Sequence, residues 1–162
     1  ESDSIISYVI ISPRMENNIG YLLSDSGRLL RKTFDERVRD LGLTAVQARL
    51  MLSLVKFPDN NQAFYAERIE VEPITLTRIV DRMEEAGWVE RVADPNDRRA
   101  RLLHLTDKSR EIVEPLRAIV NALVEDMAEG LTSREQDLLA ELLGKISANL
   151  SAEREYRNVV NV

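Results

Sequence analysis

Two short segments of the sequence concentrate side chains that donate hydrogen bonds to anions and to other acceptors. The first segment offers two threonines and two arginines, namely Thr75, Thr77, Arg78 and Arg82. The second offers three arginines, namely Arg98, Arg99 and Arg101. Guanidinium groups bind phosphate and the acceptor edge of guanine, and hydroxyl groups donate to phosphates or to base edges. The chemistry that these residues support is recognition of a nucleic acid rather than the making or breaking of bonds.

The sequence lacks the residue combinations that nucleophilic or metal-assisted catalysis needs. It contains no cysteine and one histidine, His104, which alternates with leucines on a predicted strand and is expected to face solvent. The absence of cysteine excludes disulfides, thiolate zinc sites and thiol-based oxidant sensing. The many carboxylates lie on predicted helical faces without metal-ligand spacing. We therefore expect a protein that is not an enzyme and that has no metal or cofactor.

Composition and charge bound the class of protein. The chain has 162 residues, of which 44% are hydrophobic and 31% charged, the balance of one soluble globular domain. It has neither an apolar run of about 18 residues nor a secretory signal, so we expect a cytoplasmic protein with no membrane partner. The net charge of −6 argues against a nucleic-acid partner. However, Glu125 to Glu155 holds eight acids and three bases, whereas Arg91 to Arg101 holds four bases and two acids.

The first segment is positioned by two predicted helices with a short link between them. One helix covers about residues 62–70, and the other begins at Pro73, a residue tolerated in the first helical turn, and ends at Ala86 before Gly87. Two helices joined in this way form a helix-turn-helix, whose second helix enters the major groove of DNA.

The polar and apolar residues of this second helix separate into two faces. The apolar residues Ile79, Val80 and Met83 fall on the inner side, and the threonines and arginines named above fall on the outer side. We expect Arg78 to make a bidentate contact to guanine, through two hydrogen bonds from its guanidinium group. The alternative is that these are solvated residues of a surface helix.

The second segment is positioned by a predicted β-hairpin. Strands at residues 88–92 and 101–105 flank the turn signal Asp94-Pro95-Asn96-Asp97, and the arginines lie at or beside the hairpin tip. From there they can reach the minor groove or phosphates, and Asp97 is expected to brace Arg99 or to cap the turn. The alternative is a solvated run of charge. A hairpin next to a helix-turn-helix is a wing.

Helices are predicted on both sides of the winged region. The first covers about residues 19–41, and a capping box at Thr44-x-x-Gln47 opens the next, through Val55. After the hairpin, a helix capped by Thr106 and interrupted by Pro115 reaches about residue 129, and another capping box at residues 132–135 opens a last helix to about residue 152. The predicted fold class is mainly α with a small β-hairpin (α+β), a winged helix-turn-helix between N- and C-terminal dimerisation helices.

The sequence from Glu72 to Arg91, followed by Asp94 to Arg101 and by Leu105-Thr106, resembles the MarR (multiple antibiotic resistance regulator) family, including its SlyA-like branch. The Asp-x-Arg wing that ends in Leu-Thr is the most specific part, and the resemblance covers about residues 19–152. It implies a triangular, mostly helical dimer with a recognition helix at residues 73–86 and with transcriptional repression relieved by small, often aromatic, acids. Residues 60–65 depart from many relatives, and the cysteine of redox-sensing members is absent.

The resemblance implies that residues 15–43 and 107–155 form the dimerisation region and residues 44–106 the DNA-binding region, with residues 156–162 as a tail. Residues 1–14 carry a β-branched patch that does not match the helical pattern that follows, so we expect a tag or disordered extension rather than a functional arm. A homodimer would place two recognition helices about one turn of DNA apart, as a palindromic operator requires. The apolar stripes of the outer helices are equally compatible with a monomeric core.

The resemblance also implies an effector site. An arginine of the first helix of relatives meets the carboxylate of an aromatic acid, and Arg28 and Arg31 stand at matching positions. The alternative is that they are solvated or paired, for example Arg31 with Asp35 four residues on. The predicted function is a homodimeric transcription regulator, a repressor, that binds double-stranded DNA at a pseudo-palindromic operator and is released by a small-molecule effector. The competing interpretation is a winged-helix module that binds protein and not DNA.

Overall fold

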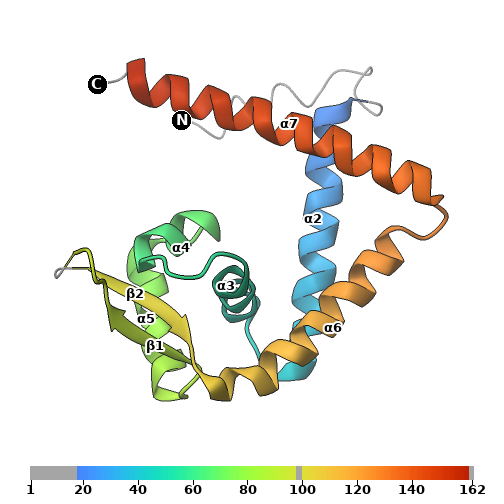
Figure 1. Cartoon of the computed structure of the whole chain (residues 1–162). Coiled ribbons are helices and arrows are strands. Elements are labelled where there is room, and N and C mark those ends of the chain that lie inside the picture. The colour runs from blue at the N-terminus through green and yellow to red at the C-terminus, as the bar shows by residue number, and fades with distance from the viewer. Residues whose placement is uncertain (1–17, 98–99, 161–162) are drawn as a thin grey trace. The chain divides into compact units, whose positions relative to one another are not determined.

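The computed structural model describes residues 18–97 and 100–160 of the chain (Figure 1). Its elements are, in order, α2 (Ile19–Val38), the 3-10 helix η1 (Arg39–Leu41), α3 (Ala45–Lys56), α4 (Gln62–Arg68), α5 (Pro73–Glu85), β1 (Val89–Ala93), β2 (Arg101–Leu105), the 3-10 helix η2 (Asp107–Ser109), α6 (Arg110–Met127) and α7 (Ser133–Val160). The predicted mainly helical fold with one hairpin is confirmed. The segment predicted as an extension, residues 1–14, lies outside the described residues, and none of the described helices is long and apolar enough to cross a membrane.

The chain forms two compact units, Glu1–Leu123 and Val124–Val162. The core of the first unit gathers buried side chains from the end of α2 through α6. Its fully buried large members are Val38, Leu50, Met51, Tyr65, Leu76, Val80, Met83, Val89, Leu103 and Leu116. Burying an aliphatic side chain of this size stabilises a fold by about 1.5–3 kcal/mol, so this core fixes α5 and the hairpin on the same body.

The helix ends of the first unit follow the local signals of the sequence. The predicted capping box is present, because Gln47 N donates to Thr44 Oγ1 at 3.3 Å and Thr44 N donates to Gln47 Oε1 at 2.9 Å. Gly42 and Gly87 take left-handed backbone conformations, with φ of 71° and 75°, and end η1 and α5 as glycine does at helix C-termini.

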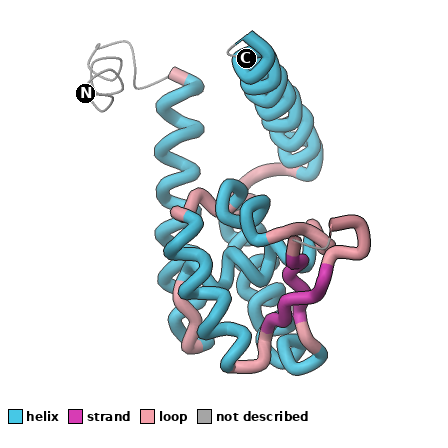
Figure 2. Tube along the Cα trace, turned by 90° about the vertical axis from the view of Figure 1, so that its left-hand side faces the viewer, coloured by secondary structure: helices cyan, strands magenta, loops and turns pink. Residues whose placement is uncertain are grey.

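The two strands pair antiparallel, with Val89 opposite Leu105 and Ala93 opposite Arg101. The hairpin stands at one edge of the helices (Figure 2). The loop between α3 and α4 lies alongside β2, since Leu103 N donates to Asn60 O at 3.0 Å. His104 is half-buried in β2, and its Nε2 lies 3.0 Å from Asp59 Oδ1 of this loop. The prediction that His104 faces solvent was therefore wrong, because the preceding loop covers the outer face of the strand.

Two predictions about the segment after the hairpin were wrong. Thr106 does not cap a helix with its side chain; its Oγ1 donates to Gly87 O at 2.6 Å, and η2 precedes α6. Pro115 lies inside α6 without interrupting it. Buried Val113 and Leu116 flank the proline, and their packing offsets the loss of one backbone hydrogen bond.

The second unit consists of the end of α6, a turn and α7. Gly130 has φ of 81°, and the second predicted capping box is present, with Thr132 N donating to Glu135 Oε2 at 2.8 Å. Hydrogen bonds from the Thr132 hydroxyl and backbone lower the pKa of the Glu135 carboxyl. α7 reaches Val160 and not residue 152, so part of the segment predicted as a tail is helical. Its leucines are exposed, namely Leu138, Leu139, Leu142, Leu143 and Leu150.

Candidate nucleic-acid interface

α5 divides into an inner and an outer face, as the sequence predicts. Pro73 occupies the first turn, and Leu76, Val80 and Met83 are buried. α5 packs on α4 and on β1, which lies beside it in Figure 1. On the outer face, Thr75, Arg78 and Arg82 are exposed. Among the described residues, the side chains of Arg78 and Arg82 have no ion-pair or hydrogen-bond partner, so their donors are available to a ligand.

Thr77 lies at the border of the two faces and is half-buried. Its Oγ1 accepts a hydrogen bond from Gln62 Nε2 at 2.6 Å and donates one to Pro73 O at 2.9 Å. The hydroxyl that we predicted to be available for DNA is thus occupied within the protein. It joins the N-terminus of α4 to the first turn of α5.

Arg91 forms a clasp between β1 and α5 that the sequence did not reveal. Its guanidinium donates to Glu84, to Asp81 Oδ1 at 2.6 Å and to Gln62 Oε1 at 3.4 Å. Its backbone N also donates to Glu84 Oε1, at 3.2 Å. Burial alone would lower the pKa of Arg91, but the hydrogen bonds and charges of Asp81 and Glu84 outweigh burial and raise that pKa. Arg91 therefore contributes no free positive charge to the wing.

The base of the wing loop is closed by short-range hydrogen bonds. Ala100 N donates to Asp97 O at 3.0 Å, and Asn96 N donates to Asp94 Oδ1 at 2.8 Å. Arg101 is exposed, and its Nη1 donates to Ala100 O at 3.2 Å. Arg98 and Arg99 lie outside the described residues, and so does the predicted contact of Asp97 with Arg99.

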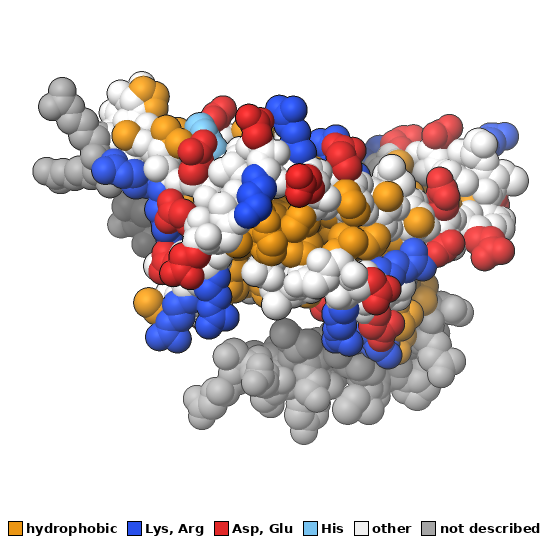
Figure 3. All heavy atoms as spheres, turned by 90° about the horizontal axis from the view of Figure 1, so that it is seen from below, with side chains coloured by type: hydrophobic (Ala, Val, Ile, Leu, Met, Phe, Trp, Pro, Cys, Tyr) orange, Lys and Arg blue, Asp and Glu red, His pale blue; other side chains and the backbone are white. Residues whose placement is uncertain are grey.

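The surface on the hairpin side carries charges of both signs. Figure 3 shows Lys and Arg side chains there with Asp and Glu side chains between them. Part of the acidic charge is already neutralised within the protein, since Asp81 and Glu84 pair with Arg91. Arg91 balances only one of these two carboxylates, so the positive charge on the outer face of α5 comes from Arg78 and Arg82.

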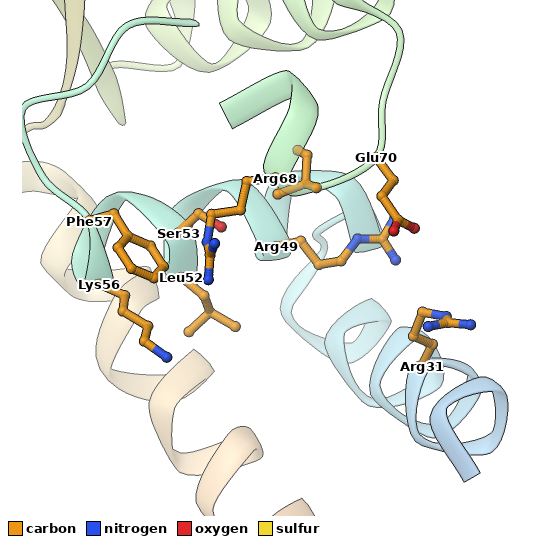
Figure 4. Close-up of a pocket in the computed structure, with 9 residues that line it drawn as sticks. Arg31, Arg49, Leu52, Ser53, Lys56, Phe57, Arg68 and Glu70 are labelled. Atoms are coloured by element: carbon orange, nitrogen blue, oxygen red, sulfur yellow. The ribbon is translucent and has the colours of Figure 1, made fainter. Parts of the chain in front are cut away.

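A hollow of about 680 Å³ is lined by residues of α2, of α3 and of the end of α4. Four cationic side chains from three different helices line it (Figure 4). They are Arg31, Arg49, Lys56 and Arg68, and Glu70 is the one acid in the lining. The described lining therefore carries more positive than negative side chains.

The hollow also offers a flat apolar surface and an unused donor. The guanidinium carbon of Arg68 lies 3.8 Å from the centre of the Phe57 ring, and Leu52 and Ile69 complete the apolar lining. Arg49 Nε is buried without a hydrogen-bond partner, although Nη1 of the same side chain lies 3.6 Å from Asp35 Oδ1.

The structure separates the two arginines predicted for an effector. Arg28 does not line the hollow, and its Nη2 pairs with Asp25 Oδ1 at 2.7 Å. Arg31 does line it. Among the described residues, Asp35 Oδ1 lies 3.6 Å from Arg49 Nη1, and the pair of Arg31 with Asp35 that the sequence offered as an alternative is not formed. Helical spacing within α2 could not reveal Arg49 or Arg68, because these residues arrive from other helices.

Comparison with known proteins identifies the family of this fold. The model of the MarR family matches residues 43–100. The crystal structure of transcriptional regulator PA3341 is 33% identical in sequence, with a TM-score of 0.74 over 82% of this chain and 98% of that chain. The chain belongs to the MarR family. As a winged-helix member of that family, it is a DNA-binding transcription regulator.

Two further solved structures are similar over most of their length. Wild-type MarR from E. coli in its apo form is 29% identical, with a TM-score of 0.68 over 79% of this chain and 95% of that chain. The transcriptional repressor CouR, bound to a 23-mer DNA duplex, is 27% identical, with a TM-score of 0.68 over 83% of this chain and 96% of that chain.

Proposed function

We propose that this MarR-family chain is a homodimeric repressor that binds a pseudo-palindromic operator and leaves it when a small anionic effector binds. The observation that carries the DNA-reading part is the outer face of α5, where Arg78 and Arg82 are exposed beside Thr75 and have no partner among the residues that the structure describes. CouR, a relative, is a repressor in complex with duplex DNA. We further propose that the chain belongs to the SlyA-like branch, because of its Asp-x-Arg wing that ends in Leu105-Thr106. We also propose that it is located in the cytoplasm, where the chromosome of a bacterium lies.

Each predicted residue has a distinct part in this proposal. Arg78 binds guanine in the major groove, and Thr75 and Arg82 contact bases or phosphates beside it. Thr77 acts by holding α5 against α4, since its hydroxyl is already bonded. From the hairpin, Arg98, Arg99 and Arg101 contact the minor groove or phosphates.

Selection of duplexes from a random palindromic library tests DNA reading. We expect sequence-selective binding that weakens steeply between two salt concentrations, because cationic side chains release counterions from phosphates. Arg78→Ala should relax the preference at one base pair per half-site. Arg110→Ala, which removes one exposed charge at the start of α6, is the matched control and should bind like wild type. No binding at low salt would refute the proposal.

The proposal of a homodimer is supported by apolar side chains that the described chain leaves exposed. On α2 they are Ile19, Tyr21, Leu22, Leu23, Leu29 and Leu30, and the leucines of α7 named above form a second set. Exposed apolar patches of this extent mark interaction surfaces. We keep residues 15–43 and 107–155 as the proposed dimerisation region and residues 44–106 as the DNA-binding region.

Oligomeric state is the test of this step. Light scattering of wild type should give twice the mass of one chain. The Leu142→Arg variant should have the mass of a single chain and should lose selective DNA binding. Dimer mass without selective binding to any duplex would instead favour a winged-helix module that binds protein.

The cationic hollow supports an aromatic acid as the effector. We propose that Arg31 and Arg49 bind its carboxylate and that its ring lies against Phe57 and Leu52. Ligand binding there would move the end of α4, and the Gln62–Thr77 hydrogen bond would pass that movement to α5.

Benzoate is the probe that separates the two predicted arginines. We expect it to raise the thermal midpoint of wild type and to release selected duplex, and Arg31→Ala should abolish both effects. Arg28→Ala is the control, since Arg28 pairs with Asp25 outside the hollow. An equal response to benzoate in wild type and Arg31→Ala would exclude this site.

A further inference from the structure

One large hydrophobic side chain on α5 is exposed and does not belong to the core. Ile74 is 64% exposed. Within the described part of residues 44–106, it is the one large hydrophobic residue in the exposed class. Single exposed hydrophobic residues are common on protein surfaces, so its meaning depends on its position.

Ile74 occupies the outer face of α5 in its first turn. It precedes Arg78 by four residues, which places the two side chains next to each other on the same helical face. The face opposite holds Leu76, Val80 and Met83 in the core. Residues at the N-terminal end of a recognition helix are the ones that approach base edges in the major groove. Ile74 is therefore presented together with the proposed guanine-binding arginine.

The chemistry of the major groove limits what such a side chain can recognise. Three of the four bases present only hydrogen-bonding groups at characteristic positions there, whereas thymine adds a C5-methyl group. A branched aliphatic side chain gains nothing from a donor or acceptor but is stabilised by burial against a methyl group.

We propose that Ile74 is a specificity-determining residue that selects thymine by contact with its C5-methyl group, next to the base pair that Arg78 reads. This inference rests on the proposed DNA-reading function. It assigns apolar readout to one position of each half-site, where contact with a methyl group and not a hydrogen bond selects the base. Thr75, the neighbouring residue on the exposed surface, carries the competing methyl group.

The test uses duplexes that wild type selects from the random palindromic library. Each thymine of a half-site is replaced in turn by uracil, which keeps base pairing and removes only the methyl group. At one position we expect wild-type affinity to fall about fourfold per half-site, the effect of one buried methyl group. Ile74→Ala should weaken binding to the thymine duplex by a similar factor and should bind the thymine and uracil duplexes equally.

The matched control is Thr75→Ser, which keeps the hydroxyl and removes only the threonine methyl group. Thr75→Ser should show the same loss of affinity as wild type when thymine is replaced by uracil. The inference is overturned if no uracil position weakens wild-type binding, if Ile74→Ala keeps the uracil effect, or if Thr75→Ser loses it. Failure of wild type to select any duplex would instead refute the DNA-reading function itself. Circular dichroism checks that the variants fold. Because Ile74 is exposed, we expect Ile74→Ala to leave folding unaffected.

Discussion

The Arg91 clasp allows a prediction in which stability and DNA reading change together. Arg91→Met keeps most of the aliphatic stem but removes the cation that lies between Asp81 and Glu84. Two carboxylates three residues apart on α5 then repel each other without a partner. The hairpin also loses the guanidinium contacts that link it to α5, so both the stability of the fold and the orientation of the wing should be affected.

The size of the effect follows from exposure. Asp81 and Glu84 side chains are 52% and 41% exposed, so solvent screens both pairs and each contributes about 0.2–1 kcal/mol. Loss of both pairs should lower the free energy of unfolding by about 0.5–2 kcal/mol. For a chain of this size, that corresponds to a thermal midpoint lower by about 1–8 °C.

Thermal unfolding by circular dichroism, at fixed protein concentration, measures this loss. The difference between wild type and Arg91→Met should shrink in about 1 M salt, because screening removes the ionic part. Arg101→Met is the stability control, since it removes the same charge from the same hairpin at an exposed position, and should change stability by less than about 0.5 kcal/mol. Equal midpoints for wild type and Arg91→Met, or equal losses in both variants, would refute the reasoning.

Three further predictions concern single contacts. Thr44→Ala removes the capping box of α3 and should lower the free energy of unfolding by about 1 kcal/mol, whereas Thr44→Ser should not, as denaturant titration would show. Tyr65→Phe removes the hydrogen bond to Phe57 O and should cost about 0.5–1.5 kcal/mol. Burial raises the pKa of Tyr65, so its contribution to stability is full below pH about 10 and is lost above it; Tyr65→Phe should flatten this alkaline loss. The pKa of Glu135 is lowered, so its pH dependence runs the other way: Glu135 stabilises α7 above the unfolded pKa, and this stabilisation is lost on acidification. A loss of stability at acid pH that is the same in Glu135→Gln as in wild type would contradict this.

The features that the sequence predicted well are those with a local cause. The capping box at Thr44 and the helix end at Gly87 depend on residues within one turn, and both are present. The two faces of α5 follow from helical periodicity, which needs no knowledge of the neighbouring elements.

The features that escaped prediction depend on contacts between distant segments. Gln62 reaches Thr77 across 15 residues, and Arg91 reaches Asp81 from the hairpin, so periodicity within α5 could not show that one hydroxyl and one arginine were occupied. The cationic hollow draws its lining from three helices for the same reason. His104 became half-buried because the loop containing Asp59 lies against its strand, a contact that alternation along β2 does not encode.

The hydrogen bonds around Gly87 and Thr106 bear on how the hairpin can change in evolution. Thr106 donates to Trp88 O at 3.1 Å through its backbone and to Gly87 O at 2.6 Å through its hydroxyl, so the two ends of the hairpin meet. A segment whose ends are tied together can be exchanged as a cassette without redirecting the chain on either side. Chimeras that receive residues 88–105 from a relative but keep Val89, Arg91 and Leu103 should therefore fold, because these three residues make the contacts with the core and with α5. Operator preference contributed by the wing can then be inherited separately from that of the recognition helix.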